Sequence, residues 1–487
     1  MALSSGWPLL PRPFGRTGIL GDSMNHAGGP FADTLAEARQ ILRLGTPAIF
    51  AQLAYFSMRV VDTVMAGQLG PEPLAAIALG SSLWMPLAVM GMGVLLPVSP
   101  SVAQAVGAER IADCGHYLRQ GLWLSQVVAL LLALAFAASP QILALFGVDP
   151  ALIPLSSQFL MSLSWGLPAR MAFVVLRGFT EGTGHTRPIL WISIVGTLAN
   201  IGLNELLMYG HWGFPALGAV GCGYATAIVD VLMARLLGLW ISWHPDLARY
   251  TPWSRWEWPQ WKPIVHFLAV GLPISVSLLM EVSCFGAAGL LLGRLGPTVV
   301  AGHQIAMNLA SLTFMVPLGL SIAISVRVAQ FVGGHEFDRA RRTGQTGAML
   351  CGGSMLLAAL AFWLVPHLFV GCYTSDEEVL RLGSQLLVLA ALFQFFDGLQ
   401  VAATGALRGL KQTRGTMVVN TIAYWGLGLP LGAWLGLHLK WGAPGFWLAF
   451  SVAIGFAAAL LNWQFHQYFV RRPEISPPSA PADPLPS

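Results

Sequence analysis

The sequence predicts an all-α, polytopic membrane protein with about 12 transmembrane helices in two six-helix lobes, related by a parallel internal repeat. Three observations lead to this fold class. Of the 487 residues, 55% are hydrophobic and only 10% are charged, which is too little charge to cover the surface of a soluble protein. Apolar stretches of the length that crosses a bilayer recur from Ile41 to Phe469. The second half of the chain resembles the first when the chain is shifted so that Gly45 falls on Gly271.

The expected spans are bounded mostly by glycine, proline or charged residues. They cover residues 42–64, 75–98, 119–138, 152–175, 188–209, 218–243, 264–292, 300–323, 345–368, 379–402, 416–437 and 445–468. We therefore expect a disordered cytosolic tail at 1–34, an N-lobe at 35–243, a cytosolic inter-lobe linker at 244–262, a C-lobe at 263–470 and a second disordered cytosolic tail at 471–487. The first tail is broken by prolines and glycines and has no signal-peptide pattern.

Positive charges alternate between the predicted connections. Five loops carry most of them, at Arg110 and Arg119, at Arg177 and Arg187, at Arg249, Arg255 and Lys262, at Arg339, Arg341 and Arg342, and at Arg408, Lys411 and Arg414. The positive-inside rule places these loops in the cytoplasm. The sequence thus predicts a multi-pass protein of the cell inner membrane with both termini cytoplasmic.

The internal repeat rests on three matches at this one shift, which we call the repeat shift. Gly45–Pro47 falls on Gly271–Pro273, Gly67–Pro71 on Gly293–Pro297, and Val102–Gly107 on Val328–Gly333. At a slightly larger shift, Leu176–Gly178 echoes Leu407–Gly409. Because six spans is an even number, both halves start on the same side of the membrane, as parallel repeats do. Transporters built in this way bind substrate between the halves.

Several function classes lack their motifs. The three lysines, Lys262, Lys411 and Lys440, fit no phosphate-binding loop, and the eleven histidines form no HExxH pattern, which argues against an ATP-driven pump or a metalloenzyme. The five cysteines are scattered and form no CxxC pair, so no disulfide framework or CxxC metal site is implied. We expect no cofactor. The formal charge of +4 is spread over loops rather than gathered into a patch for nucleic acid.

Five of the 22 acidic residues lie inside the predicted spans: Asp62, Glu205, Asp230, Glu281 and Asp397. Each costs about a few kcal/mol in lipid unless it is paired, hydrated or protonated. Such a carboxyl group is suited to hold a proton or to bind a hard cation through its oxygens.

Two of these acids have clear structural alternatives. Asp62 follows Arg59 by three residues on one helical face, so an ion pair between them and a functional role for Asp62 both remain open. For Glu205 we expect a position at the outer interface, while Asp230 receives no role.

Several motifs carry a resemblance to a known family. They are Val61–Gly67, Leu74–Trp84, Gly218–Thr226, Ala301–Ala306 and Ala406–Gly409. In combination, over residues 35–465, they resemble the multidrug and toxic compound extrusion (MATE) family, in its NorM-like bacterial branch. The resemblance implies a V-shaped pair of lobes and a secondary antiporter, not an enzyme. It would export cationic dyes and fluoroquinolone-like drugs in exchange for Na⁺ or H⁺.

The resemblance also implies a site. Glu281 and Asp397 lie where NorM-like members carry their cation-site carboxylates, and so are expected to bind the coupling H⁺ or Na⁺. Asp62 matches the family's first-helix aspartate. Some members carry an aspartate in the fifth helix where this chain has Asn204, so that titratable group is missing here. The expected substrate-binding residues are Tyr55, Gln52, Asn200, Asn204, Gln304, Phe393 and Gln400.

The rival hypothesis is a flippase for an anionic, lipid-linked precursor, whose cavity should be lined with arginines. Arg170, Arg235 and Arg327 are expected near the cytosolic ends of their helices, where long side chains reach the interface. An acidic interior with a basic rim favours a cationic cargo. We expect a monomer in contact with drugs and membrane lipid, and no nucleic-acid partner.

Overall fold

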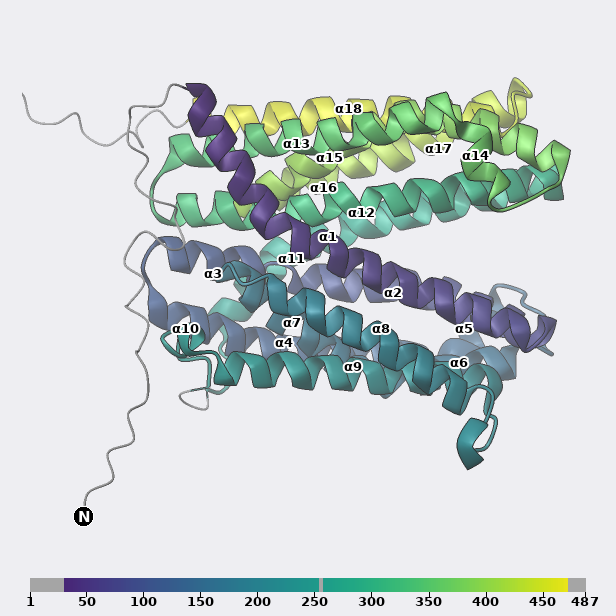
Figure 1. The fold of residues 1–487 in the computed structure, drawn as a ribbon, viewed down its shortest axis with the longest axis horizontal. Coiled ribbons are helices and arrows are strands. Elements are labelled where there is room, and N and C mark those ends of the chain that lie inside the picture. Colours follow the sequence, from purple (N-terminus) through teal and green to yellow (C-terminus); the bar gives the residue numbers. More distant parts are fainter. Residues whose placement is uncertain (1–29, 254–256, 472–487) are drawn as a thin grey trace, which may run out of the picture.

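The computed structural model describes residues 30–253 and 257–471, and every regular element in that part of the chain is a helix (Figure 1). The first helix, α1, begins at Pro30. The helix therefore begins within the predicted N-terminal tail, 1–34. The rest of that tail, and residues 472–487 of the second, lie outside the described residues.

Helices of the first half follow one another without long loops. They are α1 (Pro30–Gln68), α2 (Pro71–Leu95), α3 (Val98–Gly107), α4 (Ile111–Ala137), α5 (Ser139–Leu145), α6 (Ile153–Ser164), α7 (Leu167–Gly182), α8 (Arg187–Leu207), η1 (His211–Gly213), α9 (Gly218–Trp243) and α10 (Pro245–Ala248). We call α1–α9 the first lobe.

The second half repeats this order. It contains α11 (Trp261–Leu292), η2 (Gly293–Leu295), α12 (Pro297–Gly333), α13 (Phe337–Leu364), α14 (Pro366–Gly371), α15 (Glu377–Gly409), α16 (Thr413–Thr421), η3 (Ile422–Gly428), α17 (Leu429–Ala433), η4 (Trp434–His438) and α18 (Ala443–Val470). We call α11–α18 the second lobe. Figure 1 shows the two lobes as two stacked sets of nearly parallel helices.

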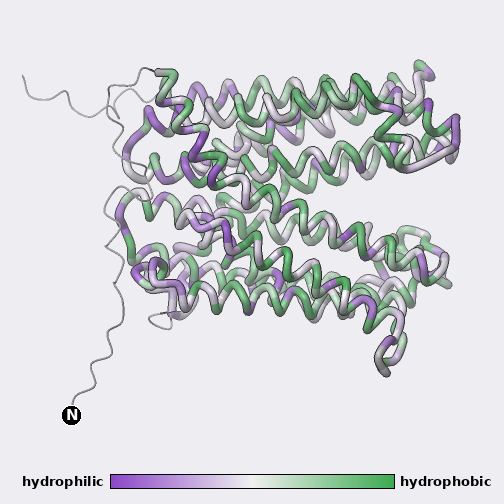
Figure 2. The backbone as a smooth tube through the Cα atoms, in the orientation of Figure 1, coloured by the Kyte–Doolittle hydropathy of each residue, from purple (hydrophilic) through white to green (hydrophobic). Residues whose placement is uncertain are grey.

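Ten helical segments of the described chain are long and apolar enough to cross a membrane, or eleven if α6 and α7, bent by 48°, count as one span. The first predicted span lies in α1, which is not among these segments because Gln52, Arg59 and Asp62 lower its mean hydropathy. Every other predicted span lies on one helix or on consecutive ones. Hydrophobic residues cover the middle of the helices, and hydrophilic residues gather mainly at the end on the left of Figure 2. The chain is therefore a multi-pass membrane protein.

The two halves repeat in backbone detail at the predicted repeat shift. Gly70 and Gly296 both precede a helix, with φ values of 115° and 106°. Glu109 and His335 both adopt the left-handed region, at 56° and 61°, just before α4 and α13 begin. Non-glycine residues rarely adopt this conformation, so its recurrence at one shift confirms the repeat.

One predicted match is wrong as a structural equivalence. A Cβ added at Gly182 would lie 2.7 Å from the Ser99 carbonyl oxygen, and one at Gly409 would lie 2.6 Å from that of Ser325. Ser99 and Ser325 are themselves related by the repeat shift, so Gly182 is the packing counterpart of Gly409. The sequence match had paired Gly409 with Gly178, one helical turn earlier, because it followed residue identity rather than packing.

The lobes meet through glycines in the parts of α1, α2, α3, α11 and α12 nearest one end of the bundle. This end, which we call the basic end, holds the loops at 108–110, 183–186, 334–336 and 410–412, with Arg110 and Lys411 among their residues. A Cβ added at Gly107 would overlap the Gln330 carbonyl, and one at Gly333 would overlap that of Gln104. The lobes are therefore in backbone contact at the basic end.

The first turns of α1 pack against the second lobe, which Figure 1 shows as a diagonal crossing from α13. Glu37 accepts two hydrogen bonds from Arg327 of α12, at 2.6 and 2.7 Å, and one from the Thr343 hydroxyl at 2.8 Å. Arg327 is only 2% exposed. The expectation that Arg327 reaches the interface is wrong, because a carboxylate far away in the sequence neutralises it inside the protein.

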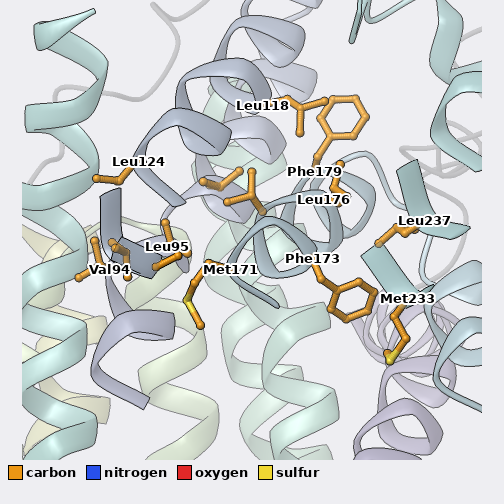
Figure 3. Packing of buried hydrophobic residues seen from close by; sticks show 14 of the residues in the cluster. Val94, Leu95, Leu118, Leu124, Met171, Phe173, Leu176, Phe179, Met233 and Leu237 are labelled. Carbon is orange, nitrogen blue, oxygen red and sulfur yellow. The ribbon is translucent and has the colours of Figure 1, made fainter. Parts of the chain in front are cut away.

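Each lobe has its own apolar core. In the first lobe, residues of α2, α3, α4, α7 and α9 form one buried cluster, part of which Figure 3 shows: Val94, Leu95, Leu118, Leu124, Met171, Phe173, Leu176, Phe179, Met233 and Leu237. A second cluster in the other lobe surrounds Phe285 and Trp447. Each core consists mainly of residues from its own lobe, but the first also contains Phe267 of α11, so core packing holds each lobe together and also contributes to the contact between the lobes.

The predicted linker, 244–262, includes α10 and is fastened to the first lobe. Arg119 of α4 donates to the carbonyl oxygens of Thr251 and Pro252, at 2.7 and 3.0 Å, and pairs with Glu257 at 2.7 Å. The Trp123 indole N–H donates to the Glu257 carbonyl at 2.9 Å. The linker is thus attached to α4 and leads directly into α11.

Candidate functional site

Glu281 and Asp397 lie on α11 and α15 of the second lobe, where Asp397 is buried and Glu281 is partly buried. Asp397 is 4% exposed and lies within electrostatic reach of Glu281. Both carboxyl groups also lie within electrostatic reach of the Tyr424 hydroxyl, which comes from the π-helical segment η3. Three distant segments thus place two acids and a phenol in one region.

These groups lack protein partners. Among the described residues, neither carboxylate accepts a hydrogen bond or joins an ion pair, and the buried Tyr424 hydroxyl has no hydrogen-bond partner. Every other intramembrane acid in this part of the chain has one. Because buried polar groups are nearly always paired, this cluster has free capacity for a ligand.

The local backbone at Tyr424 is irregular. The predicted span at 416–437 changes from α-helix to π-helix at Ile422, and the Cys284 thiol donates to the Tyr424 carbonyl at 3.3 Å. Single π-helical segments recur at functional sites, because the wider turn leaves main-chain groups available and rotates side chains. Here the wide turn contains Tyr424, which lies within electrostatic reach of both acids.

A polar layer lies one helical turn from the acids, on the side of the basic end. The Asn420 side-chain amide donates to the Ser277 hydroxyl at 2.6 Å, and the Gln400 side-chain amide donates to Asn420 Oδ1 at 3.2 Å. Ser277 precedes Glu281 by four residues, Asn420 of α16 precedes Tyr424 by four, and Gln400 follows Asp397 by three. Gln400, expected to contact substrate, is thus part of a hydrogen-bonded floor below the carboxylates.

An aromatic layer lies one turn away on the opposite side. The ring of Phe285 packs edge-on against Phe393, Tyr424 and Phe450, with centroids 6.1, 6.0 and 5.1 Å apart. Phe393 in turn contacts Trp447 at 5.7 Å. Phe393 was expected to bind substrate, and it is buried within this layer.

Polar atoms without partners continue into the aromatic layer. The Trp447 indole nitrogen, His303 Nδ1 and the Gln394 side-chain oxygen are buried and have no hydrogen-bond partner. The His303 and Trp447 rings are 5.9 Å apart. No pattern in the sequence pointed to Trp447, Tyr424 or Gln394, because their roles depend on which helix faces meet.

The first lobe holds a different acid. Asp62 accepts a hydrogen bond from the Asn204 amide at 2.7 Å, and Asn204 also contacts Asn200 at 3.4 Å. The alternative of an ion pair with Arg59 is not realised in the described chain, where Arg59 approaches the Met85 sulfur at 3.6 Å. Asp62, Asn200 and Asn204 therefore form one group across α1 and α8.

Arg170 is inside the first lobe rather than at its rim. It is 7% exposed, its Nε donates to Asp230 at 2.8 Å, and its guanidinium lies over the rings of Trp84 and Tyr55 at 4.8 and 5.8 Å. The expectation that Arg170 reaches the interface is wrong. Arg170 lies about 18 Å of helix before Gly182, where α7 reaches the basic end, and Asp230 neutralises it there.

The remaining expected residues are dispersed. Gln52 accepts a hydrogen bond from Arg177 at 3.0 Å, and Arg177 also pairs with Glu181. Gln304 is exposed on α12. Glu205 is exposed and lies 3.0 Å from His211, and its position at the outer interface stays a prediction.

The arrangement permits cation or proton binding at one place above all. Oxygen ligands suit H⁺ and hard cations, and Glu281, Asp397 and Tyr424 supply such atoms without competing partners. The Asp62 group offers a second, amide-rich position. The described chain shows no nucleophile, base and orienting group in hydrogen-bonded series, the arrangement that covalent catalysis requires.

Comparison with known proteins identifies the family. The family model MatE matches residues 47–206 and 273–434, two segments whose first residues are related by the repeat shift. The multidrug resistance protein PmpM of Pseudomonas aeruginosa is 40% identical over 432 residues, which cover 88% of this chain and 90% of that protein. The multidrug resistance protein MdtK of Edwardsiella ictaluri is 37% identical, covering 87% and 94%.

Solved structures share the fold. A eukaryotic MATE transporter, AtDTX14, has a TM-score of 0.82 at 21% identity and covers 91% of this chain and 100% of its own. A multidrug resistance MATE family transporter in an outward-facing conformation has a TM-score of 0.81 at 18% identity, covering 89% and 96%. The chain belongs to the MatE family, and it is a transporter rather than an enzyme.

Proposed function

We propose that this chain is a multidrug efflux antiporter that exports organic cations by alternating access, in exchange for Na⁺ or H⁺. The substrates would include cationic dyes and fluoroquinolone-like drugs. The names of its relatives support drug efflux, and membership of the family supports alternating access between two lobes. No cofactor is required, because the ion gradient drives transport.

The observation that carries the proposal is the unpaired state of Glu281 and Asp397. A buried carboxylate costs roughly several kcal/mol unless a proton or a cation neutralises it, and no protein cation does so among the described residues. A coupling ion that binds this pair would therefore be held strongly. The polar floor at Asn420 and the aromatic layer at Phe285 give the same region surfaces for an ion and for an apolar cation.

The exchange follows from competition. We propose that the basic end faces the cytoplasm, by the positive-inside rule, so that backbone contact there leaves the opposite side as the open one. An incoming ion at Glu281 and Asp397 would compete with the positive charge of a bound drug. It would release the drug outward before the lobes rock. Each ligand shifts this equilibrium only through its different affinity for the two states.

In the first lobe we propose Asp62 as an auxiliary coupling group, with Asn200, Asn204 and Tyr55 as substrate contacts. Its hydrogen bond from Asn204 is formed by a neutral donor, so Asp62 can accept a proton without breaking an ion pair. Gln52, Gln304, Phe393 and Gln400 complete the proposed set of substrate contacts. The transporter would act as a monomer in the inner membrane.

The flippase hypothesis has one observation in its favour, the buried Arg170. Its charge is matched by Asp230 at 2.8 Å, and the buried Arg327 is matched by Glu37. Neither arginine is thus free to bind an anionic precursor, which favours the cationic cargo.

The test is ethidium efflux from reconstituted vesicles under an imposed Na⁺ gradient and, separately, an imposed H⁺ gradient. We expect one gradient to drive efflux and expect Glu281→Gln and Asp397→Asn to abolish it. Glu205→Gln is the matched control, because Glu205 is an exposed acid bonded to His211 and should transport normally.

Two results would overturn the proposal. Wild-type protein that is correctly inserted but exports no ethidium under either gradient would favour the flippase, to be tested with lipid-linked sugar. Efflux undiminished in both variants would remove coupling from the second lobe, and Asp62→Asn would then be the variant to measure.

A further inference from the structure

A second cluster of ligand-type side chains lies at the basic end of the first lobe, away from the membrane interior. His185 follows the end of α7, His244 follows the last residue of α9, and Asp246 lies in the first turn of α10. One ligand atom from each of these three residues lies within 4.8 Å of the others. We propose that His185, His244 and Asp246 form a binding site for a divalent transition-metal ion such as Zn²⁺.

The two imidazoles are already gathered. Their ring centroids are 5.3 Å apart, and both rings contact Trp240, at 4.5 Å from His244 and 6.0 Å from His185. The Nδ1 atom of His244 is buried and has no hydrogen-bond partner. A buried ring nitrogen without a partner is costly, and a bound metal ion would satisfy it.

The backbone holds these residues in fixed positions. The His185 N–H donates to the Thr180 carbonyl at 2.9 Å, and the preceding Gly184 adopts a φ of 84°, which closes the short loop. The His244 N–H donates to the Trp240 carbonyl at 3.0 Å, and the His244 carbonyl accepts a hydrogen bond from the Leu247 N–H at 3.1 Å. Because these hydrogen bonds fix the loop and the helix end, binding would require little rearrangement.

The donor set selects the class of ion. Two imidazoles and one carboxylate are typical ligands of Zn²⁺, Co²⁺ and Ni²⁺, whereas Mg²⁺ and Ca²⁺ require more oxygen ligands than one aspartate provides. Three protein ligands leave one tetrahedral position for water. Asp246 is exposed, so the ion can exchange with the surrounding solution.

The ion would connect the loop between α7 and α8 to the start of the linker. All three ligands belong to one lobe and its attached linker, so the ion would not favour one lobe arrangement over another. It would instead stabilise the folded first lobe, since a ligand that binds only the folded state raises its stability.

The experiment uses the full-length protein, purified through a tag without histidine and stripped of metal by a chelator. It is titrated with Co²⁺, whose visible absorption bands report tetrahedral coordination by nitrogen and oxygen. We expect one equivalent of Co²⁺ to produce these bands, Zn²⁺ to remove them by displacement, and Zn²⁺ to raise the Tm. These readouts do not depend on transport.

The variants His185→Ala and His244→Ala should lose the bands and the Zn²⁺-dependent rise in Tm, and the exposed Asp246→Asn should bind Co²⁺ at least tenfold more weakly. His211→Ala is the matched control, because His211 also lies beside a carboxylate, Glu205, but has no third ligand in the described chain. Absence of Co²⁺ bands in folded wild-type protein would overturn the proposal. Bands that persist in both histidine variants would overturn it equally.

Discussion

Gln104 and Gln330 occupy equivalent positions in the two lobes, and each donates a hydrogen bond to the last residue of a helix in the opposite lobe. The Gln104 side-chain amide donates to the Gly409 main-chain carbonyl at 2.9 Å, and the Gln330 side-chain amide donates to the Gly182 main-chain carbonyl at 3.2 Å. The carbonyls at a helix C-terminus have no partner within their own helix. Each lobe thus caps a helix of the other, and the two bonds form only while the basic end is closed.

Loss of these two bonds should open the basic end. A hydrogen bond contributes about 1 kcal/mol net, which is roughly a fivefold change in population for each bond. We expect the Gln104→Ala/Gln330→Ala double variant to increase the fraction of molecules with separated basic ends. Distances between spin labels on the two lobes measure this fraction. Gln120→Ala is the control, since Gln120 bonds the Trp258 carbonyl without joining the lobes' cores; an unchanged distance distribution in the double variant would contradict the interpretation.

Backbone contact at the crossing of α3 and α12 should make Gly107 and Gly333 intolerant of any side chain. A Cβ at either position overlaps a carbonyl group of the other lobe. Gly107→Ala and Gly333→Ala should therefore separate the labels at the basic end and slow drug efflux. Gly289→Ala, where an added Cβ meets nothing within 4 Å, should leave both unchanged. Normal closure in Gly333→Ala would show that the lobes are not held this close in the membrane.

Arg327 and Glu37 should matter more to stability than their neighbours Arg342 and Asp33. The first pair is buried and bidentate, so Arg327→Met leaves an uncompensated carboxylate and should cost about 3 to 5 kcal/mol. The second pair involves an exposed arginine, so Arg342→Gln should cost about 1 kcal/mol or less. Thermal unfolding in detergent measures both. A double variant, Glu37→Gln/Arg327→Met, should recover part of the loss, and no recovery would contradict the charge argument.

Lys411 should make closure of the basic end depend on pH. Burial in the loop after α15, and then the positive charge of Arg110, lower the pKa of Lys411 to about 8. An ordinary lysine titrates at about pH 10.4. An open basic end would hydrate Lys411, so the open state binds more protons between these two pH values. Closure should therefore strengthen as the pH rises through about 8, and change little below it.

The measurement for Lys411 is the interlobe distance between the same spin labels, recorded from neutral to alkaline pH. Lys411→Met removes the titrating group and should abolish the dependence. Arg110→Gln removes the second cause and should move the transition to higher pH. A transition that survives in Lys411→Met would belong to another titrating group. His266 of α11, which lies within electrostatic reach of Lys411, is such a group.

The sequence by itself determined that most of the chain lies in lipid, where its membrane spans lie, and that its two halves repeat. Lipid burial requires long apolar helices whatever their partners, so span positions such as 218–243 could be predicted closely from composition alone. The repeat shift was equally visible, because glycines such as Gly70 and Gly296 are required by local backbone conformation. Glu281 and Asp397 stood out as acids in apolar surroundings, and the family resemblance selected them for the coupling site.

Only the tertiary structure decided which charges are already neutralised. Arg170 and Asp230 are 60 residues apart, and Arg327 and Glu37 are 290 apart. Whether such residues meet depends on how each helix is rotated and on the end of the bundle at which helices cross. These quantities are set by packing between helices, about which a hydropathy pattern carries little information. Glu281 and Asp397 remain without a partner in the described chain for the same reason: the helices around them present Tyr424 and aromatic rings rather than a cation.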